Sequence, residues 1–452
     1  MKYTKAKFYL TLSVLIIIGL LYFINSIIGN NKYKDLKNLF SFEQKKIIKK
    51  YIFPYKYIDQ LEKNVDDLSY ASRELKFKKK SKDIEIYKDS ILSNGMDLKR
   101  YLLREGFYYG IKYINPGSGY IDFYENNIFI LSSRGVLGYS KSLTDENVIK
   151  QIKNNINDFI GLKQFKKDNW FSLKDILIYK NKVFISYTEE IQEDCWNTSI
   201  IYGKIDYKNI SFKKLFSPTE CVHSWKNIDK EFHAAQSGGR LVAYDDNNIL
   251  LSIGDYRSRH LAQNRESVNG KILKVNINSG EYEIITMGHR NQQGLYFDKE
   301  NNFILETEHG PTGGDEINLI EVQKISTKKI LNYGWPVASA GEHQGGSAEK
   351  QKETYKKYPL YKSHKKYGFI EPLKSFVPSI GISEIVKTKQ NKYVASSLKD
   401  KSLYFFELNK DKEIINLERV EVFERVRDLR FYNNKLYLFL EHTASIGVIS
   451  LN

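Results

Sequence analysis

The sequence feature that most constrains the fold is a short pattern that occurs six times along the chain. Each copy has an apolar strand, a tight turn rich in Asn or Asp, and a second apolar strand. The copies read DFYENNIFIL, LIYKNKVFIS, AYDDNNILLS, FDKENNFILE, KTKQNKYVAS and FYNNKLYLFL. Asn and Asp tolerate the positive φ that two-residue hairpin turns require, so each copy predicts a β-hairpin.

The spacing of these hairpins indicates a repeat-built fold. The second strands begin at Ile128, Val183, Ile249, Phe303, Tyr393 and Leu436, which are 55, 66, 54, 90 and 43 residues apart. These intervals are close to the period of about 40–50 residues of propeller blades. Because further apolar strands lie between the hairpins, we predict an all-β fold, a six-bladed β-propeller over residues 90–452. A β-sandwich is the alternative, but it has fewer strands.

The N-terminal segment predicts a membrane anchor. Residues 8–28 read FYLTLSVLIIIGLLYFINSII, and Lys2, Lys5 and Lys7 precede them. At about 1.5 Å per residue this run can cross a hydrocarbon core of about 30 Å. No small-x-small cleavage site follows, so we predict an uncleaved transmembrane signal anchor within residues 1–30. A charged helical stalk is expected at residues 31–89.

Lysines on both sides of the span leave its orientation poorly marked by charge. We expect the N-terminus inside and the propeller on the periplasmic, extracytoplasmic side, because no later segment could export the bulk of the chain. The two cysteines, Cys195 and Cys221, flank a predicted hairpin, and a disulfide between them is plausible in an oxidising compartment. Two free buried thiols are the alternative.

The positive charge does not indicate nucleic-acid binding. The formal net charge is +16, yet residues 1–60 alone contain eleven Lys against three acids. The remaining basic residues are interspersed with acids, and no RNP, zinc-finger or helix-turn-helix signature occurs. We therefore expect no nucleic-acid partner.

Nine motifs in one order resemble the glucose/sorbosone dehydrogenase family. They are SGGRL (237–241), IGDY (253–256), NGKILKVN (269–276), GHRNQQGL (288–295), EHGPTGGDEIN (308–318), NYGWP (332–336), PSIG (378–381), SLK (397–399) and RVRDL (425–429). The resemblance implies a six-bladed propeller that oxidises aldoses with pyrroloquinoline quinone (PQQ) and calcium. It is strong over residues 237–440 and weak over residues 118–236.

The resemblance also implies which residues bind the cofactor. PQQ has three carboxylates and an o-quinone, so its site needs several cations and a flat apolar wall. The residues that match the family's cofactor positions are Arg290, Asn291, Gln293, Trp335, Lys399, Arg425 and Arg427. Tyr333 is a further candidate for the wall, although a core aromatic pair with Trp335 is the alternative. Arg425 and Arg427 alternate across Val426, so on a strand both would face one side.

The calcium ligands implied by the resemblance are main-chain carbonyls of Gly310 and Pro311. Oxygen ligands suit Ca²⁺. Asp315 and Glu316 are expected to brace this loop. His309 has the chemistry of a metal ligand, but a packing histidine is an equally good interpretation.

One departure from the family concerns the general base. The family has a His four residues before the Arg of its GGRL motif, and here that position is Gln236. Glutamine cannot take up a hydroxyl proton at neutral pH, whereas His can. His233, three residues earlier, is the substitute that the sequence offers. The family's Gln-Gly-Gly segment is also replaced, by FSLKDIL at residues 171–177.

Two functions follow from these observations. The first is a membrane-anchored quinoprotein that oxidises an aldose sugar or related alcohol by hydride transfer to PQQ and passes electrons to an external acceptor. The second is a non-catalytic propeller that acts as a binding or scaffold module at the cell envelope. The retained cationic residues favour the enzyme, and Gln236 favours the binding module.

Overall fold

The computed structural model describes residues 82–83, 85–103, 118–141, 143, 148–325, 330–344, 349 and 351–451, and six isolated positions between 44 and 65. The predicted membrane span at residues 8–28 lies outside the described residues, as does most of the predicted stalk. Within the described part, the structure contains no helix that is both long and apolar enough to cross a membrane.

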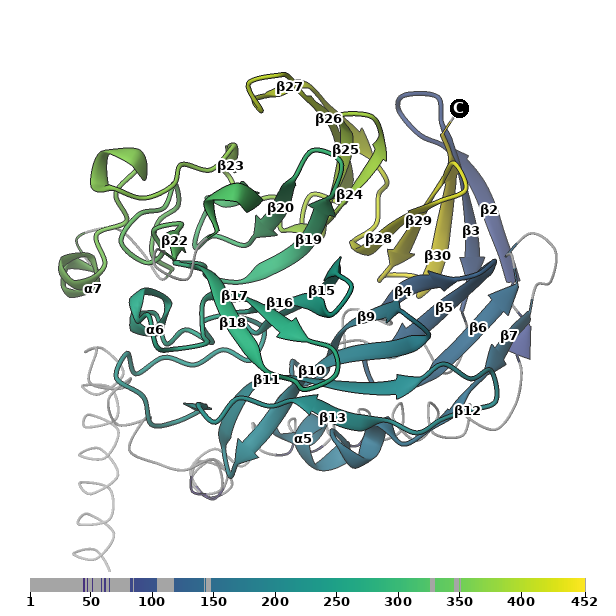
Figure 1. The fold of residues 1–452 in the computed structure, drawn as a ribbon, viewed down its shortest axis with the longest axis horizontal. Coiled ribbons are helices and arrows are strands. Elements are labelled where there is room, and N and C mark those ends of the chain that lie inside the picture. The colour runs from purple at the N-terminus through teal and green to yellow at the C-terminus, as the bar shows by residue number, and fades with distance from the viewer. Residues whose placement is uncertain are drawn as a thin grey trace, which may run out of the picture.

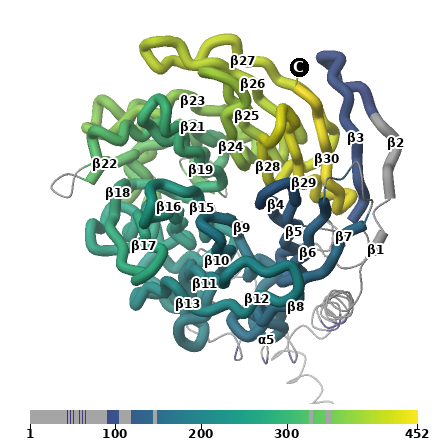
Figure 2. The backbone as a smooth tube through the Cα atoms, turned by 45° about the vertical axis from the view of Figure 1, so that its right-hand side comes forward, coloured from purple at the N-terminus to yellow at the C-terminus, as the bar shows by residue number. Residues whose placement is uncertain are grey.

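The described strands form six blades arranged in a ring, as the sequence predicts (Figure 1). Each blade is a mainly antiparallel sheet with one strand of its hairpin nearest the centre of the ring, and the pair of β18 (Tyr282–Met287) with β22 (Leu331–Asn332) is parallel (Figure 2). Consecutive inner strands contact each other all the way around. The inner strands are β4 (Gly119–Tyr124), β9 (Leu173–Tyr179), β15 (Gly238–Asp245), β19 (Gln292–Asp298), β24 (Ile382–Lys389) and β28 (Val426–Tyr432).

The six predicted hairpins are the first two strands of the six blades. The second strands are β5 (Asn127–Ser132), β10 (Lys182–Gln192), β16 (Asn248–Ile253), β20 (Phe303–Glu308), β25 (Lys392–Ser397) and β29 (Lys435–Leu440). Positive φ occurs in five of these turns, for example at Asn181, Asn302 and Asn391. The prediction from Asn-rich turns is therefore confirmed, for the conformational reason given.

The third and outer strands complete the blades. The third strands are β6 (Leu137–Lys141), β11 (Cys195–Lys204), β17 (Lys271–Asn276), β21 (Asp315–Glu321), β26 (Ser402–Leu408) and β30 (Ser445–Ser450). The outer strands in four blades are β7 (Val148–Gln151), β13 (Lys213–Phe216) with β14 (Val222–His223), β18 (Tyr282–Met287) with β22 (Leu331–Asn332), and β23 (Lys374–Phe376). In the fifth blade the outer strand is β27 (Ile414–Glu421).

The two ends of the propeller join in one blade and close the ring. Strand β3 (Asp97–Leu102) pairs antiparallel with the C-terminal strand β30, and β2 (Glu85–Ile91) continues that sheet outward. The short strand β1 (Lys82–Asp83) pairs with β7 in the next blade. Because both ends of the propeller pair in one sheet, the first and last blades cannot separate without breaking strand hydrogen bonds. The propeller sheets begin at Lys82, ahead of the boundary at residue 90 that the sequence predicts.

The hydrophobic core is divided among the interfaces between neighbouring blades. Strand β29 illustrates this division, because alternate side chains of a strand face opposite sides of the sheet. Leu436 and Leu438 pack in the cluster shared with the preceding blade, whereas Phe439 packs in the cluster shared with β4 and β5. Each blade is therefore buried on both faces, and the ring behaves as one packed body.

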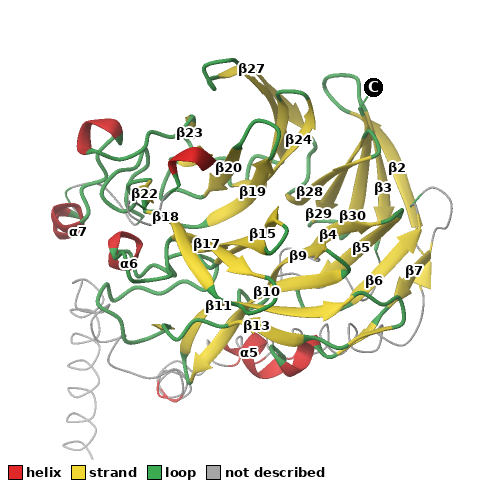
Figure 3. Cartoon of the chain, in the orientation of Figure 1, coloured by secondary structure: helices red, strands yellow, loops and turns green. Residues whose placement is uncertain are grey.

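Within the described residues from Lys82 onward, the helices are short and lie at the periphery (Figure 3). They are α5 (Leu162–Lys167), α6 (His260–Gln263) and α7 (Lys352–Lys357). There are also 3₁₀ turns at residues 156–158, 322–324 and 365–367. A parallel pair of two-residue strands, β8 (Lys153–Asn154) and β12 (Asn209–Ile210), joins two blades. The structure joins Cys195 to Cys221, which confirms the predicted disulfide. The hairpin between them, β11 with β13, is also as predicted.

Candidate active site at one face of the ring

Irregular pairing in the inner strands aims side chains into the centre of the ring. Five of the six inner strands carry at least one extra residue relative to their hairpin partners, a β-bulge. A bulge bends its strand and redirects a side chain. The extra residues, which have no partner on the second strand of the hairpin, are Lys174 in β9, Gln293 in β19 and Arg427 in β28. The bulge in β15 includes Arg240.

These redirected side chains meet in one cleft. The cleft is lined by Tyr120, Trp170, Lys174, Ala235, Ser237, Gly238, Arg240, Gln292, Gln293 and Arg427. Because every blade repeats the same order of strands, the beginnings of the inner strands lie at the same face. The cleft therefore opens where successive blades bring their first residues together.

Lys174 is the titratable group of this cleft with the most perturbed environment. It is buried, and its Nζ donates to the carbonyl of Trp170 at 2.8 Å. Burial lowers the pKa of Lys174 to about 7, with further lowering by the nearby charges of Arg427 and Arg134 and a small opposing effect of Asp168. At neutral pH the amine is thus close to half-protonated.

Arg427 reaches the cleft with one edge of its guanidinium while Glu441 holds the other. Its Nε donates to Glu441 Oε1 at 2.6 Å, and its Nη1 donates to Gln293 Oε1 at 3.3 Å. Arg425 donates to the second oxygen of the same carboxylate at 2.7 Å. The prediction that Arg425 and Arg427 face one side is confirmed, but the carboxylate they share belongs to the protein. Burial opposes ionisation of Glu441, yet the two arginines lower its pKa to about 2.

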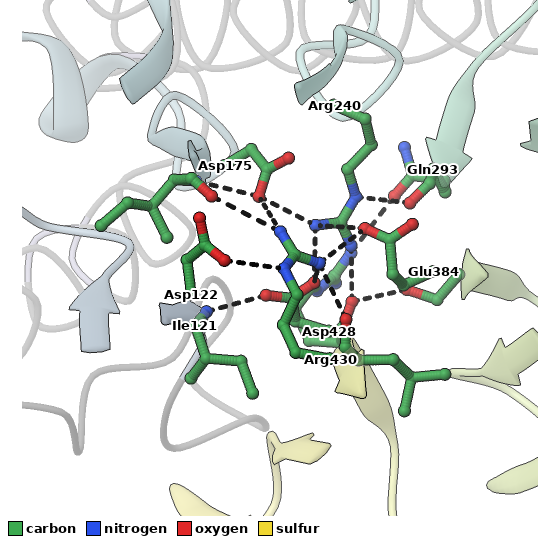
Figure 4. A network of polar contacts seen from close by, with 12 residues as sticks. Ile121, Asp122, Asp175, Arg240, Gln293, Glu384, Asp428 and Arg430 are labelled. Carbon is green, nitrogen blue, oxygen red and sulfur yellow. Dashed lines mark hydrogen bonds and ion pairs between the residues drawn. The ribbon is translucent and has the colours of Figure 1, made fainter. Parts of the chain in front are cut away.

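A second charged group, shown in Figure 4, adjoins the cleft, because Arg240 belongs to both. Arg240 Nη1 lies 3.2 Å from Asp175, 3.2 Å from Glu384 and 3.0 Å from Asp428. Arg430 pairs with the same three acids and lies 3.6 Å from Asp122.

We call these six residues the deep network: Asp122, Asp175, Arg240, Glu384, Asp428 and Arg430. Burial raises the pKa of Glu384 to about 7 and that of Asp122 to about 6, although Arg430 opposes the change at both sites. The network joins five of the six inner strands, so it holds the blades together at the axis.

Gln236 lies beside the cleft in a polar cluster of its own. With its amide turned to suit its neighbours, Nε2 donates to Asp255 at 3.1 Å and Oε1 accepts from Arg290 Nη2 at 2.9 Å and from Arg257 at 3.0 Å. Trp335 donates to the other oxygen of Asp255 at 2.8 Å, and the Arg290 guanidinium lies over the Trp335 ring at 5.3 Å. Burial raises the pKa of Asp255 to about 6, against the lowering effect of Arg290.

His233 adjoins the rim of the cleft. Its ring is 6.3 Å from that of Trp170, and its Nδ1 accepts a hydrogen bond from the backbone N–H of Ala235 at 3.2 Å. A neutral imidazole that accepts at Nδ1 carries its proton at Nε2. Neither ring nitrogen then presents a free lone pair, so this geometry does not favour His233 as a base.

The other predicted cofactor residues occupy different positions at the same face. Gln293 lines the cleft, and Asn291 lies behind it, accepting from Gln293 at 3.0 Å and from the backbone of Gly238 at 3.2 Å. Lys399 is exposed between β25 and β26, where its backbone N–H donates to Ile380. Tyr333 is buried away from the cleft, because its ring stacks on His289 at 4.8 Å.

The loop predicted to bind calcium is held by the protein itself. Arg290 Nη1 donates to the carbonyl of Gly310 at 2.6 Å and to that of His309 at 2.8 Å. The carbonyl of Pro311 accepts from Ser379 at 3.4 Å. Asp315 accepts from the backbone N–H of Gly310, which supports its predicted bracing role. A guanidinium so close to the Gly310 carbonyl does not fit a cation at the same oxygen.

Four residues that shape the cleft and its support were not predicted from the sequence: Tyr120, Trp170, Lys174 and Glu441. Lys174 carried a signal, since a lysine in the apolar run FSLKDILIY has no place on a buried strand without a polar environment. The signal for Glu441 was weaker: it is an acid directly after a strand that pairs with the strand following Arg425. Trp170 carried none, because it precedes the strand.

Comparison with known proteins places the chain in a family. Residues 173–447, more than half of the chain, match the Glucose / Sorbosone dehydrogenase family. An uncharacterised Synechocystis protein, slr1608, is 30% identical over 223 residues, which are 43% of this chain and 50% of that protein. Aldose sugar dehydrogenase YliI of Escherichia coli is 25% identical over 272 residues, 55% of this chain and 67% of the relative.

Solved structures agree on the fold. The apo form of the soluble aldose sugar dehydrogenase from Escherichia coli aligns with a TM-score of 0.58 at 18% identity, covering 82% of this chain and all of that one. The PQQ-bound aldose sugar dehydrogenase from Streptomyces coelicolor aligns with a TM-score of 0.54 at 16% identity, covering 74% of this chain and 99% of that one. The chain spans only half the length of the Synechocystis relative. From the family match and the six-bladed ring together, the chain belongs to the glucose/sorbosone dehydrogenase family.

Proposed function

We propose that this protein is an oxidoreductase that oxidises an aldose sugar or a related alcohol, with PQQ bound in the cleft. The observation that carries the proposal is the convergence of the Arg427 guanidinium and the Lys174 amine with two aromatic residues, Tyr120 and Trp170, in one cleft at the mouth of the ring. A flat cofactor with three carboxylates fits such a set, because cations hold its carboxylates and aromatic side chains offer it an apolar wall. When bound, PQQ would supply the hydride acceptor.

The protein's own residues have separate roles in this proposal. Arg427 holds a cofactor carboxylate, with its guanidinium kept in place by Glu441 and Gln293. Arg290 orients the loop at Gly310 and stays in contact with Trp335. Gln236 keeps Arg290 and Asp255 in position and takes no proton. No calcium step is included, because Arg290 occupies the Gly310 carbonyl.

Lys174 is the proposed proton acceptor. It lines the cleft, and a group with a pKa near 7 is unprotonated often enough at neutral pH to accept a hydroxyl proton at Nζ. The hydrogen bond from Nζ to the Trp170 carbonyl holds the amine at the wall of the cleft. In this proposal Lys174, on a different blade from Gln236, thus takes the role of general base that a His has in the family.

Titration with PQQ tests the proposal. We expect the purified full-length protein to change the PQQ absorption spectrum with saturable affinity and to reduce a dye when an aldose is added. Arg427→Gln should weaken PQQ binding by at least about tenfold, since a charge-assisted hydrogen bond contributes roughly 1.5–3 kcal/mol.

Arg419→Gln is the matched control, because Arg419 forms an ion pair with Asp400 on the outer part of its blade. Unchanged PQQ spectra on titration would contradict the proposal.

For localisation, we propose that residues 8–28 anchor the propeller at the extracytoplasmic side of a membrane, where an external acceptor takes the electrons. The disulfide between Cys195 and Cys221 supports an oxidising compartment. A C-terminal alkaline phosphatase fusion should be active in cells, whereas a fusion that is inactive and stays in the cytoplasm would contradict this placement.

A binding or scaffold module is the second candidate. The observation that favours it is Gln236, an amide locked between Asp255 and two arginines where the family has its base. A protein that binds PQQ or a sugar but reduces no dye at any pH between 6 and 10 would support this function over catalysis.

A further inference from the structure

A buried group of metal-ligating side chains lies apart from the cleft, between the third and fourth blades. His289, Glu306 and Glu308 each offer one ligand atom within 4.8 Å of the others. His289 and Glu306 have no exposed surface, and Glu308 is 3% exposed. His289 precedes β19, whereas both glutamates lie on one face of β20. Neither the proposed function nor the family resemblance assigns a role to Glu306 or His289.

The separations between the polar atoms suit one small cation. His289 Nδ1 lies 3.3 Å from Glu308 Oε1 and 3.9 Å from Glu306 Oε2. Ligand atoms about 2.1 Å from a shared metal are separated by comparable distances. His289 Nε2 lies 2.9 Å from Thr286 Oγ1 on β18, and a proton held at Nε2 by this contact leaves Nδ1 free as a ligand.

Asn318, on the neighbouring strand β21, supplies an independent observation. Its Nδ2 lies 3.0 Å from Glu306 Oε2 and 3.2 Å from Glu308 Oε1, so its amide reaches the same two carboxylate oxygens. Its Oδ1 is buried without a hydrogen-bond partner, as is Glu306 Oε1. With a cation bound between the carboxylates, rotation of the amide by 180° would exchange the two hydrogen bonds that Nδ2 donates for a ligand contact through Oδ1. A buried acceptor without a donor is costly unless a ligand satisfies it.

We propose that His289, Glu306, Glu308 and Asn318 form a structural site for a divalent first-row transition cation. An imidazole nitrogen with carboxylate and amide oxygens suits Zn²⁺ or Mn²⁺, whereas Ca²⁺ takes oxygen ligands. The site goes beyond the proposed function and does not depend on it.

The cation would brace the loop that carries Arg290. Glu308 Oε2 accepts from the backbone N–H of Arg290 at 2.6 Å, so a metal on the other oxygen of Glu308 would fix this contact.

Metal binding to the purified full-length protein without PQQ tests the proposal. After dialysis against a chelator, we expect titration calorimetry to show one equivalent of Zn²⁺ or Mn²⁺ bound more tightly than Ca²⁺ by at least tenfold. Saturating metal should raise the midpoint of thermal unfolding by about 3 °C or more. Glu306→Gln keeps the shape of the side chain and should lose both effects.

Glu321→Gln is the matched control, because Glu321 is a glutamate of the same blade that pairs with Lys324 and Lys412 on the surface. This variant should bind the metal as the natural protein does. The proposal would be overturned if the natural protein showed neither binding nor a thermal shift, if Glu306→Gln bound equally well, or if Ca²⁺ bound as tightly as Zn²⁺ and Mn²⁺. Since PQQ is absent throughout, a failure here leaves the proposed function unaffected.

Discussion

The deep network and the cleft take their side chains from the same inner strands, but their charges are balanced differently. In the deep network two arginines face four acids, and the Arg240 side chain is only 3% exposed. In the cleft Lys174 and Arg427 lie together, and Glu441 is the carboxylate that holds Arg427. Neighbouring residues of one strand can belong to different groups. In β9, Lys174 lines the cleft, whereas Asp175 belongs to the deep network.

This difference distinguishes charged side chains that stabilise the fold from charged side chains that are available to a ligand. A cation surrounded by acids is already neutralised, so it stabilises the ring and cannot serve a cofactor without losing its partners. A lysine whose pKa falls towards neutrality lies in a site that disfavours its charge. The cleft, and not the more highly charged network, is therefore the better binding site.

The largest effect should come from breaking the deep network. Arg240→Met removes the cation that contacts three buried acids, and we expect a loss of about 3–5 kcal/mol in the free energy of unfolding. Urea denaturation measures it. Arg419→Met, which breaks an exposed pair, should cost about 1 kcal/mol or less. Equal losses in the two variants would show that the network is not a structural element.

The next effect concerns turnover. Lys174→Met should lower dye reduction by roughly 10²–10⁴-fold while PQQ binding changes by only a few fold, because the amine accepts the proton and Arg427 remains. Steady-state rates and a PQQ titration measure the two quantities. Lys182→Met is the control, since Lys182 lies on β10 and donates to Ile277 and Asn278 on the next blade. Full activity in Lys174→Met would exclude it as the base.

The same lysine predicts a pH dependence of stability. Its pKa is about 7 in the folded protein and 10.5 ordinarily, so between these values the unfolded chain binds more protons. Stability should therefore rise with pH across this window, by up to about 1.4 kcal/mol per pH unit. Lys174→Met removes this contribution. The free energies of unfolding of the two proteins should differ most near pH 7 and converge towards pH 10.5; a constant difference would contradict the lowered pKa.

The smallest effect should come from Arg425, the more exposed of the two arginines that contact Glu441. Arg425→Gln leaves Glu441 paired with Arg427, so we expect a loss of about 1 kcal/mol or less at pH 6. The pKa of Glu441 is about 2, below its ordinary value, so its stabilising effect is present above pH 4.5 and is lost as the pH falls towards 2. Acid titration of stability in both proteins measures this, and a larger loss for Arg425→Gln than for Arg427→Gln would contradict the arrangement.

Much of the fold could be predicted because its signals are local. Asn in a turn and apolar residues at every second position depend only on near neighbours, and they located all six hairpins and the disulfide-flanked pair. The site was predicted less completely. Family motifs brought Gln293 and Arg427 to the cleft, but they placed the aromatic wall at Trp335 and Tyr333, whereas Trp170 and Tyr120 line the cleft.

The sequence by itself determined the number of blades and the order of the strands, because turn conformation and strand alternation are properties of short segments. It also determined the family, through nine short motifs in one order. Only the tertiary structure decided which charges are neutralised. Arg240 meets Asp428 across 188 residues and Asp175 across 65, once ring closure brings different blades to one axis. The lowered pKa of Lys174 likewise depends on burial and on Arg427 from another blade, and neither exists in the unfolded chain.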